Sequence, residues 1–435
     1  MRRSRLLVIL ILVSSLFSSP LFARESQEYE FDVSEFEKKP YTFGGFFELE
    51  PMLFVLDRDS ALYKLRFPGG DQGRLLGRTD LGARLEATYE KGIFSAFGRA
   101  EAFAFYDDRG WDGRLDLLEG YLTLKPTPGF ALDVGKKVTK WGTGFFQNVV
   151  SFVDRPKDPE DPQEPLEGFY VLRADFIKAF DGALRNVTFT PVVIPVGQDI
   201  NRSFGRPDHV NFAGKLYLLL WDTDLDFLFF TGDSRTTRYG VDFARNIKSN
   251  LEIHGELARI TDVARRSLDA GGEVSIVDVD VLSALAGMRY LTPNQLTIIA
   301  EYYHNGRGIG EESFENFLGF VDEAYEDFIA TGRGEPLHEA QALRGTFAGT
   351  NPMRDYLYFR ATQKEPFGIL YFTPGITSIV NLQDGSFLLT PEVQYSPLTN
   401  LALRFRTVFL VGPRGTEYGE KLSNFRLEFR ARFFF

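Results

Sequence analysis

Apolar and polar side chains alternate one by one along much of this chain. In the segment 80–89, Leu81, Leu85 and Tyr89 fall on one face, while Asp80 and Arg84 fall on the other. Strict alternation of this kind indicates a β-strand with one apolar and one polar face. From Tyr41 onward such segments recur at a length of about ten residues, which a tilted strand needs to cross a bilayer.

The alternation predicts about 18 strands joined by connections of two kinds. Short connections rich in Gly, Pro, Asn and Asp alternate with longer ones, as in a barrel with tight turns at one end and loops at the other. The longer connections are expected at 139–168, 195–210, 261–278 and 305–354. The strands are expected at 41–56, 80–89, 93–106, 114–125, 130–138, 169–177, 184–194, 211–221, 225–231, 238–247, 251–260, 280–291, 295–303, 355–363, 368–381, 386–395, 401–411 and 422–435.

This pattern predicts an all-β protein, a single transmembrane antiparallel up-and-down β-barrel that occupies residues 41–435. Because the strand count is even, both ends of the barrel are expected on the side of the tight turns, in the periplasm. A secreted β-sandwich is the alternative, since it too is built from short regular strands.

The two ends of the chain predict export to an outer membrane. Residues 1–23 read as a cleaved signal peptide, with three arginines before the apolar run 6–17 and small residues before the cleavage site. Residues 24–40 are expected to form a periplasmic segment. The last strand ends in Phe435 and resembles the assembly signal of Gram-negative outer-membrane barrels. That resemblance implies the barrel-assembly machinery and outer-membrane lipid as partners.

Composition agrees with a barrel that has a polar lumen. Aromatic residues make up 15% of the chain, with 43 Phe and 18 Tyr, yet the mean hydropathy is only −0.16. Aromatic girdles around a polar lumen need both properties at once. The absence of cysteine excludes disulfides and thiol chemistry, and the formal net charge of −11 argues against a nucleic-acid partner.

Arginines concentrate on the predicted lumen face of the last two strands. Glu48 and Glu50 of the first strand and Glu428 of the last are the acidic neighbours available in sequence. The arginines can act as a basic ladder that eases the passage of anions, or they can belong to a cross-strand salt-bridge lattice. The predicted ladder consists of Arg404, Arg406, Arg426, Arg430 and Arg432.

The loop 139–168 carries the most distinctive motif. Trp141-Gly-Thr-Gly lets the chain leave the barrel wall, because glycine adopts conformations closed to other residues. The following segment, Asp154-Arg-Pro-Lys-Asp-Pro-Glu-Asp-Pro162, packs charges between prolines. Proline fixes φ and lacks an N–H donor, so the segment is expected to be stiff and to leave the strand ladder.

This stretch resembles an uncharacterised group of outer-membrane barrels with a W-G-x-G, then R-P-K-D-P-x-D-P, then E-G arrangement, broadly similar to porins and alginate-export-type channels. The resemblance implies that the loop constricts the pore, lined by Trp141. It further implies that Arg155 and Lys157 face Asp158, Asp161 and Glu167 across the path. A rigid surface loop is the alternative.

The longest loop contains an expected amphipathic helix near 311–331, followed by Gly332 and Gly334. Its apolar stripe includes Phe314, Phe317, Val321 and Phe328, and its acidic face includes Glu323. The helix can be a plug or lid whose acidic face meets the arginines. It can equally be an extracellular cap packed on other loops.

No enzyme is expected, and neither a cofactor nor a metal. His254 is the only histidine clearly inside a predicted strand, and no serine accompanies it. The expected function is passive passage of polar or anionic solutes through a porin-like channel, either monomeric or homo-oligomeric. The alternative is a non-conducting barrel sealed by its helical loop, with outer loops that bind a partner or surface polymer.

Overall fold

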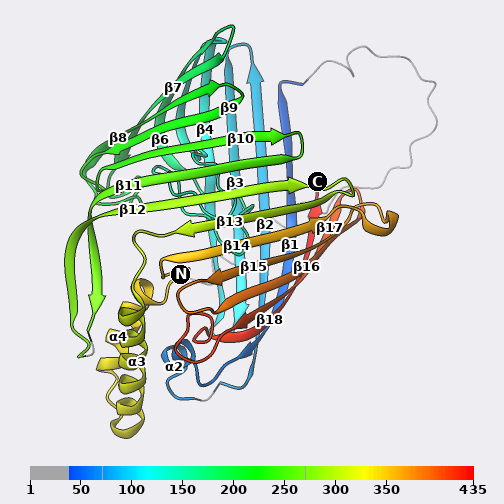
Figure 1. Cartoon of the computed structure of the whole chain (residues 1–435). Helices are drawn as coiled ribbons and strands as arrows, with labels where there is room; N and C mark the ends of the chain where they lie inside the picture. The colour runs from blue at the N-terminus through cyan, green and yellow to red at the C-terminus, as the bar shows by residue number, and fades with distance from the viewer. Residues whose placement is uncertain (1–38, 71, 270) are drawn as a thin grey trace.

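The computed structural model describes residues 39–70, 72–269 and 271–435. Within these residues, 18 antiparallel strands form one sheet that closes on itself (Figure 1). The predicted all-β barrel is therefore confirmed. The strands are β1 (Tyr41–Leu56), β2 (Leu75–Lys91), β3 (Phe94–Asp107), β4 (Gly110–Thr127), β5 (Phe130–Lys137), β6 (Phe169–Ala179), β7 (Leu184–Val196), β8 (His209–Leu220), β9 (Thr223–Thr231), β10 (Arg238–Lys248), β11 (Leu251–Leu268), β12 (Val274–Leu291), β13 (Leu296–His304), β14 (Asp355–Gln363), β15 (Phe372–Asn381), β16 (Phe387–Leu398), β17 (Leu401–Val411) and β18 (Ser423–Phe434).

The first and last strands close the barrel. β1 pairs with β18 on one side, with Glu48 opposite Arg432, and with β2 on the other. Beyond the end of β18, the N–H of Phe435 donates to the carbonyl oxygen of Gly45, and the N–H of Gly45 donates back, both at 3.1 Å. Closure pairs each strand on both sides within the barrel wall, which is the condition for a sheet surrounded by lipid.

Most connections at one end of the barrel are short turns and most at the other end are longer loops, as predicted. The exceptions are the short β3–β4 connection at the loop end and the longer β14–β15 connection at the turn end. In the turn from β8 to β9, Trp221 and Asp222 both have positive φ, 51° and 57°, as a two-residue hairpin turn requires. We call the two ends the turn end and the loop end. The strand ends Tyr41 and Phe434 both lie at the turn end.

The predicted loop 261–278 is wrong. β11 and β12 continue to pair through this region as far as Leu268 and Val274, after a bulge between Ile260 and Val263. In Figure 1 this hairpin projects beyond the neighbouring strands. Side chains on both of its faces are exposed, for example Ile276 and Val277 at 58% and 57%. The apolar–polar alternation therefore fades although the backbone pairing persists.

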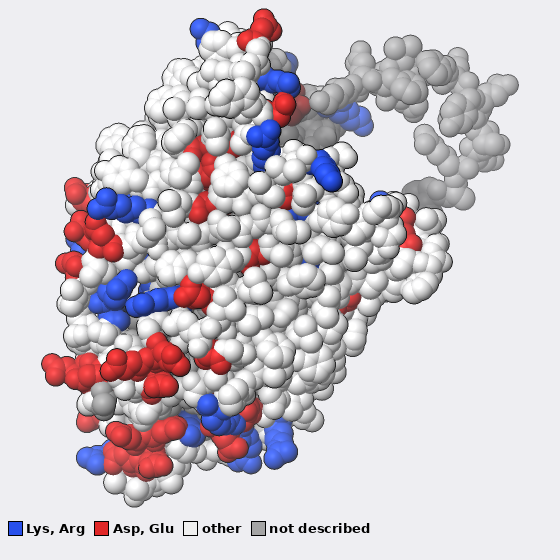
Figure 2. Space-filling model, in the orientation of Figure 1, with Lys and Arg blue, Asp and Glu red and all other residues white. Residues whose placement is uncertain are grey.

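The barrel wall is apolar outside and polar inside. On β2, Leu81 and Leu85 are 39% and 42% exposed, whereas Asp80 and Arg84 are only 9% and 8% exposed. Figure 2 shows a largely uncharged wall, with many of the charged side chains gathered toward the loop end. This distribution of apolar and polar side chains is the reverse of that in a water-soluble protein, and a lipid-facing barrel requires it.

The loop end is covered by three helices. α2 (Ala61–Arg66) follows β1, and α3 (Glu311–Thr331) and α4 (Glu335–Phe347) form a hairpin between β13 and β14 (Figure 1). A short 3₁₀ turn, η2 (Pro366–Gly368), lies between β14 and β15. The helix expected at 311–331 is confirmed, and Gly332 ends it in a left-handed conformation with φ 76°. In the described part of the chain, no helix is both long and apolar enough to cross a membrane.

Candidate functional site

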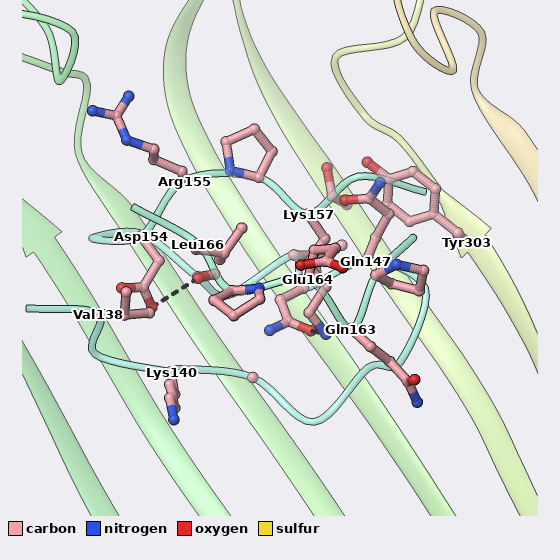
Figure 3. Close-up of a pocket in the computed structure, with 18 of the residues that line it drawn as sticks. Val138, Lys140, Gln147, Asp154, Arg155, Lys157, Gln163, Glu164, Leu166 and Tyr303 are labelled. Atoms are coloured by element: carbon pink, nitrogen blue, oxygen red, sulfur yellow. Dashed lines mark hydrogen bonds between the residues drawn. The ribbon is translucent and has the colours of Figure 1, made fainter. Parts of the chain in front are cut away.

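Residues 138–168, between β5 and β6, run through the barrel interior (Figure 3). We call this segment the inward loop. Trp141, Phe146 and Val150 have no exposed surface, and the loop backbone is bonded to side chains of β11 and β13. The sequence prediction that this loop leaves the wall and folds inward agrees with this course.

The base of the inward loop is held together by one carboxylate. Asp154 accepts a bond from the N–H of Thr139 at 2.6 Å, from the Thr139 hydroxyl at 2.7 Å and from the N–H of Trp141 at 3.3 Å. The side chain of Asp154 thereby joins the start of the loop to the beginning of its proline-rich part. Backbone donors that have left the strand ladder are satisfied in this way inside the protein.

Carboxylates of β11 and β13 hold the W-G-x-G turn against one wall. Glu256 accepts from the N–H groups of Thr143 and Gly144, both at 2.6 Å, and from Val150 at 3.2 Å. Glu301 accepts from the N–H groups of Phe145 and Phe146 at 2.6 and 2.7 Å. Such charge-assisted bonds are among the stronger ones in proteins. We call this contact the first anchor.

The glycines of the motif are required by the first anchor. A Cβ on Gly144 would lie 2.1 Å from the carbonyl oxygen of Gln147 and 3.2 Å from Glu256. Gly142 has φ +96°, and its Cβ would lie 2.8 Å from a Glu256 oxygen. The loop can approach the carboxylate this closely only because both positions lack a side chain.

Replacing Gly144 with alanine should loosen the inward loop. The clash displaces N–H groups from Glu256, and leaving buried donors unsatisfied costs about 1–3 kcal/mol. We expect cleavage within residues 138–168 by an added protease to become roughly tenfold faster. The matched control is Gly319→Ala on α3, where no atom lies within 4 Å of the new Cβ. Equal cleavage rates in the two variants would contradict the role of the glycine.

The proline-rich part of the loop is bonded to the predicted arginine ladder on β17 and β18. Arg404 pairs with Asp161 at 2.5 Å. Arg430 and Arg432 both pair with Glu164 at 2.9 Å. We call this contact the second anchor. It also includes the Arg426–Glu160 ion pair and a 3.0 Å bond from Arg406 to the carbonyl oxygen of Glu160.

The second anchor neutralises the arginines. Their other partners are the predicted acids, with Glu50 at 3.1 Å from Arg404, Glu428 at 2.5 Å from Arg406 and Glu48 at 2.6 Å from Arg432. Burial alone would raise the pKa of Glu164, but the guanidinium groups of Arg432, Arg430 and Arg84 outweigh it and lower that pKa to about 2. Each ladder arginine therefore faces carboxylates. Of the two interpretations of these arginines, the ion pairs favour the salt-bridge lattice, and the loop supplies three acids in addition to Glu48, Glu50 and Glu428.

Only one of the predicted pairs of opposite charge across the constriction is formed. Arg155 and Glu167 do pair, at 2.9 Å. Lys157 instead donates to the carbonyl oxygens of Gly144 and Phe145, at 2.5 and 3.2 Å, and to Asn148 at 2.8 Å.

The acids expected opposite Lys157 are engaged elsewhere. Asp158 accepts from the N–H of Glu160 at 2.9 Å, and Asp161 binds Arg404. Burial raises the pKa of Asp158 and lowers the pKa of Lys157. The expectation that Lys157 faces Asp158 and Asp161 is therefore wrong. Lys157 ties the two limbs of the loop together.

Trp141 is a packing residue. It is fully buried in an apolar cluster with Val153, Phe169 and Phe230. The expectation that it lines the constriction is wrong, because a side chain with no exposed surface cannot contact a passing solute.

A cavity of about 710 Å³ lies beside the inward loop (Figure 3). Loop residues Lys140, Gln147 and Gln163 line it together with Tyr303 of β13. A smaller cavity of about 160 Å³ is lined by His254 and Arg289. Lys157 and Pro162 line both cavities, so these two loop residues stand between them.

Three arginines that sequence reasoning missed also line the large cavity. Arg235 lies between β9 and β10, Arg238 begins β10, and Arg307 follows β13. They come from two loops and one strand end far apart in sequence, so no periodic pattern connects them. The only available signal was their position at predicted loop-end boundaries.

Two solved structures from Pseudomonas aeruginosa have a similar backbone. OccK5 (OpdH) gives a TM-score of 0.52 at 13% identity and covers 90% of this chain and 97% of its own. OccK11 (OpdR) gives 0.50 at 12% identity and covers 91% and 97%. Both are outer-membrane porins. This chain shares their barrel fold. The comparison with family models found no match, and neither did the comparison with curated protein sequences.

The helix α3 packs outside the strand region. It lies against α2, α4 and the end of β11, and its stripe residues Phe314, Phe317 and Val321 are buried there. On its acidic side, Asp322 pairs with Lys64 of α2 at 2.5 Å. Among the described residues, no ion pair joins α3 to the ladder arginines. The expectation that its acidic face, with Glu323, meets those arginines is therefore wrong.

His254 supports the first anchor. Its Nε2 lies 2.7 Å from Glu301, and its Nδ1 lies 3.6 Å from Glu252. The imidazole thus orients the carboxylate that receives Phe145 and Phe146. Across residues 39–70, 72–269 and 271–435, no group of three or more His, Cys, Asp or Glu side chains is placed to hold a metal ion.

Proposed function

We propose that this protein is an outer-membrane channel of porin type, through which polar solutes pass passively, and that the inward loop sets the width of the path. The observation that carries the proposal is the double anchoring of the loop. Glu256 and Glu301 hold it from β11 and β13, and ladder arginines hold it from β17 and β18. A segment held from two walls narrows a lumen without relying on its own stability.

The walls beside the loop suit polar solutes. Gln147, Asn148 and Gln163 line the large cavity together with charged side chains. Exposed apolar side chains on the outer wall, such as Leu81 and Leu85, suit contact with outer-membrane lipid. The loop motif resembles that of an uncharacterised group of outer-membrane barrels, broadly similar to porins and alginate-export-type channels, which agrees with this proposal. Selection would then depend on loop residues and on charges that remain unpaired.

One observation favours a second function, a barrel sealed at its loop end. Phe146 of the inward loop belongs to the same apolar cluster as Phe317 of α3, Phe347 of α4 and Leu62 of α2. Helices that share an apolar cluster with the inward loop can act as a cap over the lumen. In that case the outer loops, and not a pore, would bind the partner.

Current through purified protein in planar bilayers distinguishes the two functions. We expect steady single-channel steps in sodium chloride from the wild-type protein. The comparison is a variant in which residues 311–347, α3 and α4, are replaced by a short Gly-Ser linker. Steps in the wild-type protein support the channel. A wild-type protein that is silent, beside a variant that conducts, would contradict it and support the sealed barrel.

A further inference from the structure

The three arginines of the large cavity form a concentration of positive charge without acidic partners. Among the described residues, no ion pair involves Arg235, Arg238 or Arg307. The cavity's acids are engaged elsewhere, Glu119 with Arg99 at 2.8 Å, Glu164 with the ladder, and Asp154 with the loop backbone. The ladder arginines are neutralised and these three are not.

The guanidinium group of Arg235 is held in place without being neutralised. Arg235 lies over the ring of Phe204 at 3.7 Å from its centre and donates to the carbonyl oxygen of Phe152 at 3.2 Å. Arg238 is 8% exposed, and its buried Nε has no hydrogen-bond partner. Burial, and then the charges of Arg307 and Arg155, lower the pKa of Arg235 to about 10.

Of the three arginines, Arg238 is buried, Arg235 is half-buried and Arg307 is exposed. A buried guanidinium group with like charges nearby is costly unless an anion accompanies it. The planar fork of donors on arginine matches oxyanions such as carboxylate and phosphate. Asn305, Ser283 and Tyr303 line the same cavity and add neutral hydrogen-bonding groups. A cavity of about 710 Å³ has room for a small organic anion.

We propose that Arg235, Arg238 and Arg307 form a binding site for a divalent oxyanion, of the phosphate or short dicarboxylate type, on the loop-end side of the inward loop. The site indicates which solutes the proposed channel would favour. This consequence for transport rests on the proposed function, whereas binding of the anion does not. Divalent anions match it better than chloride because three uncompensated charges converge there. Arg155, which is paired with Glu167, contributes less.

Calorimetric titration of the detergent-solubilised protein with inorganic phosphate, and separately with succinate, tests the site in a sodium chloride buffer. We expect saturable binding of at least one of these ions to the wild-type protein. In the Arg238→Gln, Arg307→Gln variant, we expect affinity to fall at least about tenfold, because each lost charge-assisted bond accounts for roughly that factor. The matched control is Arg259→Gln, whose arginine is exposed and paired with Asp280 at 2.6 Å, and its affinity should stay within about twofold.

Folding is checked by circular dichroism and by heat-modifiable migration in gels. If the double variant does not fold, Arg307→Gln alone serves, since Arg307 lies outside the strands. Absence of binding of either ion to the wild-type protein, or equal binding by the variant, would overturn the site. Chloride current without phosphate or succinate binding would refute the site and leave the channel standing. Binding without current would refute the channel and leave the site.

Discussion

Replacing Glu160, Asp161 and Glu164 with their amides should widen the pore and make it more selective for anions. The three substitutions remove the acidic half of the second anchor, in which Asp161 binds Arg404 and Glu164 binds Arg430 and Arg432. Hydrogen bonds to charged groups are worth about 1.5–3 kcal/mol each, so their combined loss should free this part of the loop. We expect single-channel conductance to rise at least about twofold.

The arginine side of the same anchor provides the opposite test of selectivity. Arg404→Gln with Arg430→Gln removes both arginine partners of Asp161 and one partner of Glu164, so it leaves negative charge on the loop in excess. Conductance should again rise, while the reversal potential in a salt gradient should move toward cations instead of anions.

The control for both variants is Arg173→Gln, because Arg173 pairs within the wall with Asp175 at 2.9 Å and not with the loop. It should leave conductance and selectivity near the wild-type values. If the acid and arginine variants shift selectivity in the same direction, the second anchor does not border the conducting path.

Glu301→Ala should release the opposite side of the loop. Glu301 is 1% exposed and accepts from the N–H groups of Phe145 and Phe146 and from His254. Its removal leaves one buried and one half-buried backbone donor unsatisfied, at about 1–3 kcal/mol for a buried donor. The amides of Phe145 and Phe146 should therefore exchange hydrogen for deuterium roughly 100-fold faster, as followed by mass spectrometry.

Two further variants separate the hydrogen bonds from unrelated effects. Glu301→Gln keeps one acceptor and should accelerate exchange less than Glu301→Ala. Glu252→Ala removes a carboxylate near His254 that accepts no loop N–H, so exchange in the loop should stay unchanged. Unaltered exchange in Glu301→Ala would show that β13 does not hold the loop.

The strands could be predicted because lipid imposes one rule on every outward position. Leu81 and Leu85 must be apolar and Arg84 must face the lumen, so the alternation in β2 is visible in sequence. Where the β11–β12 hairpin extends past its neighbours, that constraint ends and the prediction failed with it. Strand pairing in this hairpin depends on backbone hydrogen bonds, which do not require a particular pattern of side chains.

Whether a helix could be predicted depends on how many residues its apolar pattern spans. α3 has 21 residues, a clear apolar stripe and a terminal Gly332, which are the signals that sequence reasoning uses. α2 has only six residues, too few for a period to appear. α4 was missed because its apolar residues are sparse, although Pro336 marks its first turn.

The candidate site was predictable in its local part and not in its contacts. Gly142 and Gly144 indicated that the chain leaves the wall, because glycine adopts backbone conformations that other residues avoid. The partner of Arg404 is Asp161, 243 residues away, and sequence alone carries no information on that distance. Consequently, the sequence left a basic ladder and a salt-bridge lattice open, and the loop acids that pair with these arginines were missed.

The most direct test of the account places a single thiol in the large cavity. The chain has no cysteine, so Gln163→Cys provides one reactive thiol in the inward loop, where Gln163 lines the cavity (Figure 3). Asp222→Cys, in a turn where the side chain is 70% exposed, is the control. Single-channel current is recorded before and after a bulky cationic thiol reagent, with mass spectrometry to confirm that both thiols react. The account predicts that current falls in Gln163→Cys and stays constant in Asp222→Cys. A fully modified Gln163→Cys protein that conducts as before would contradict the claim that the inward loop constricts a channel.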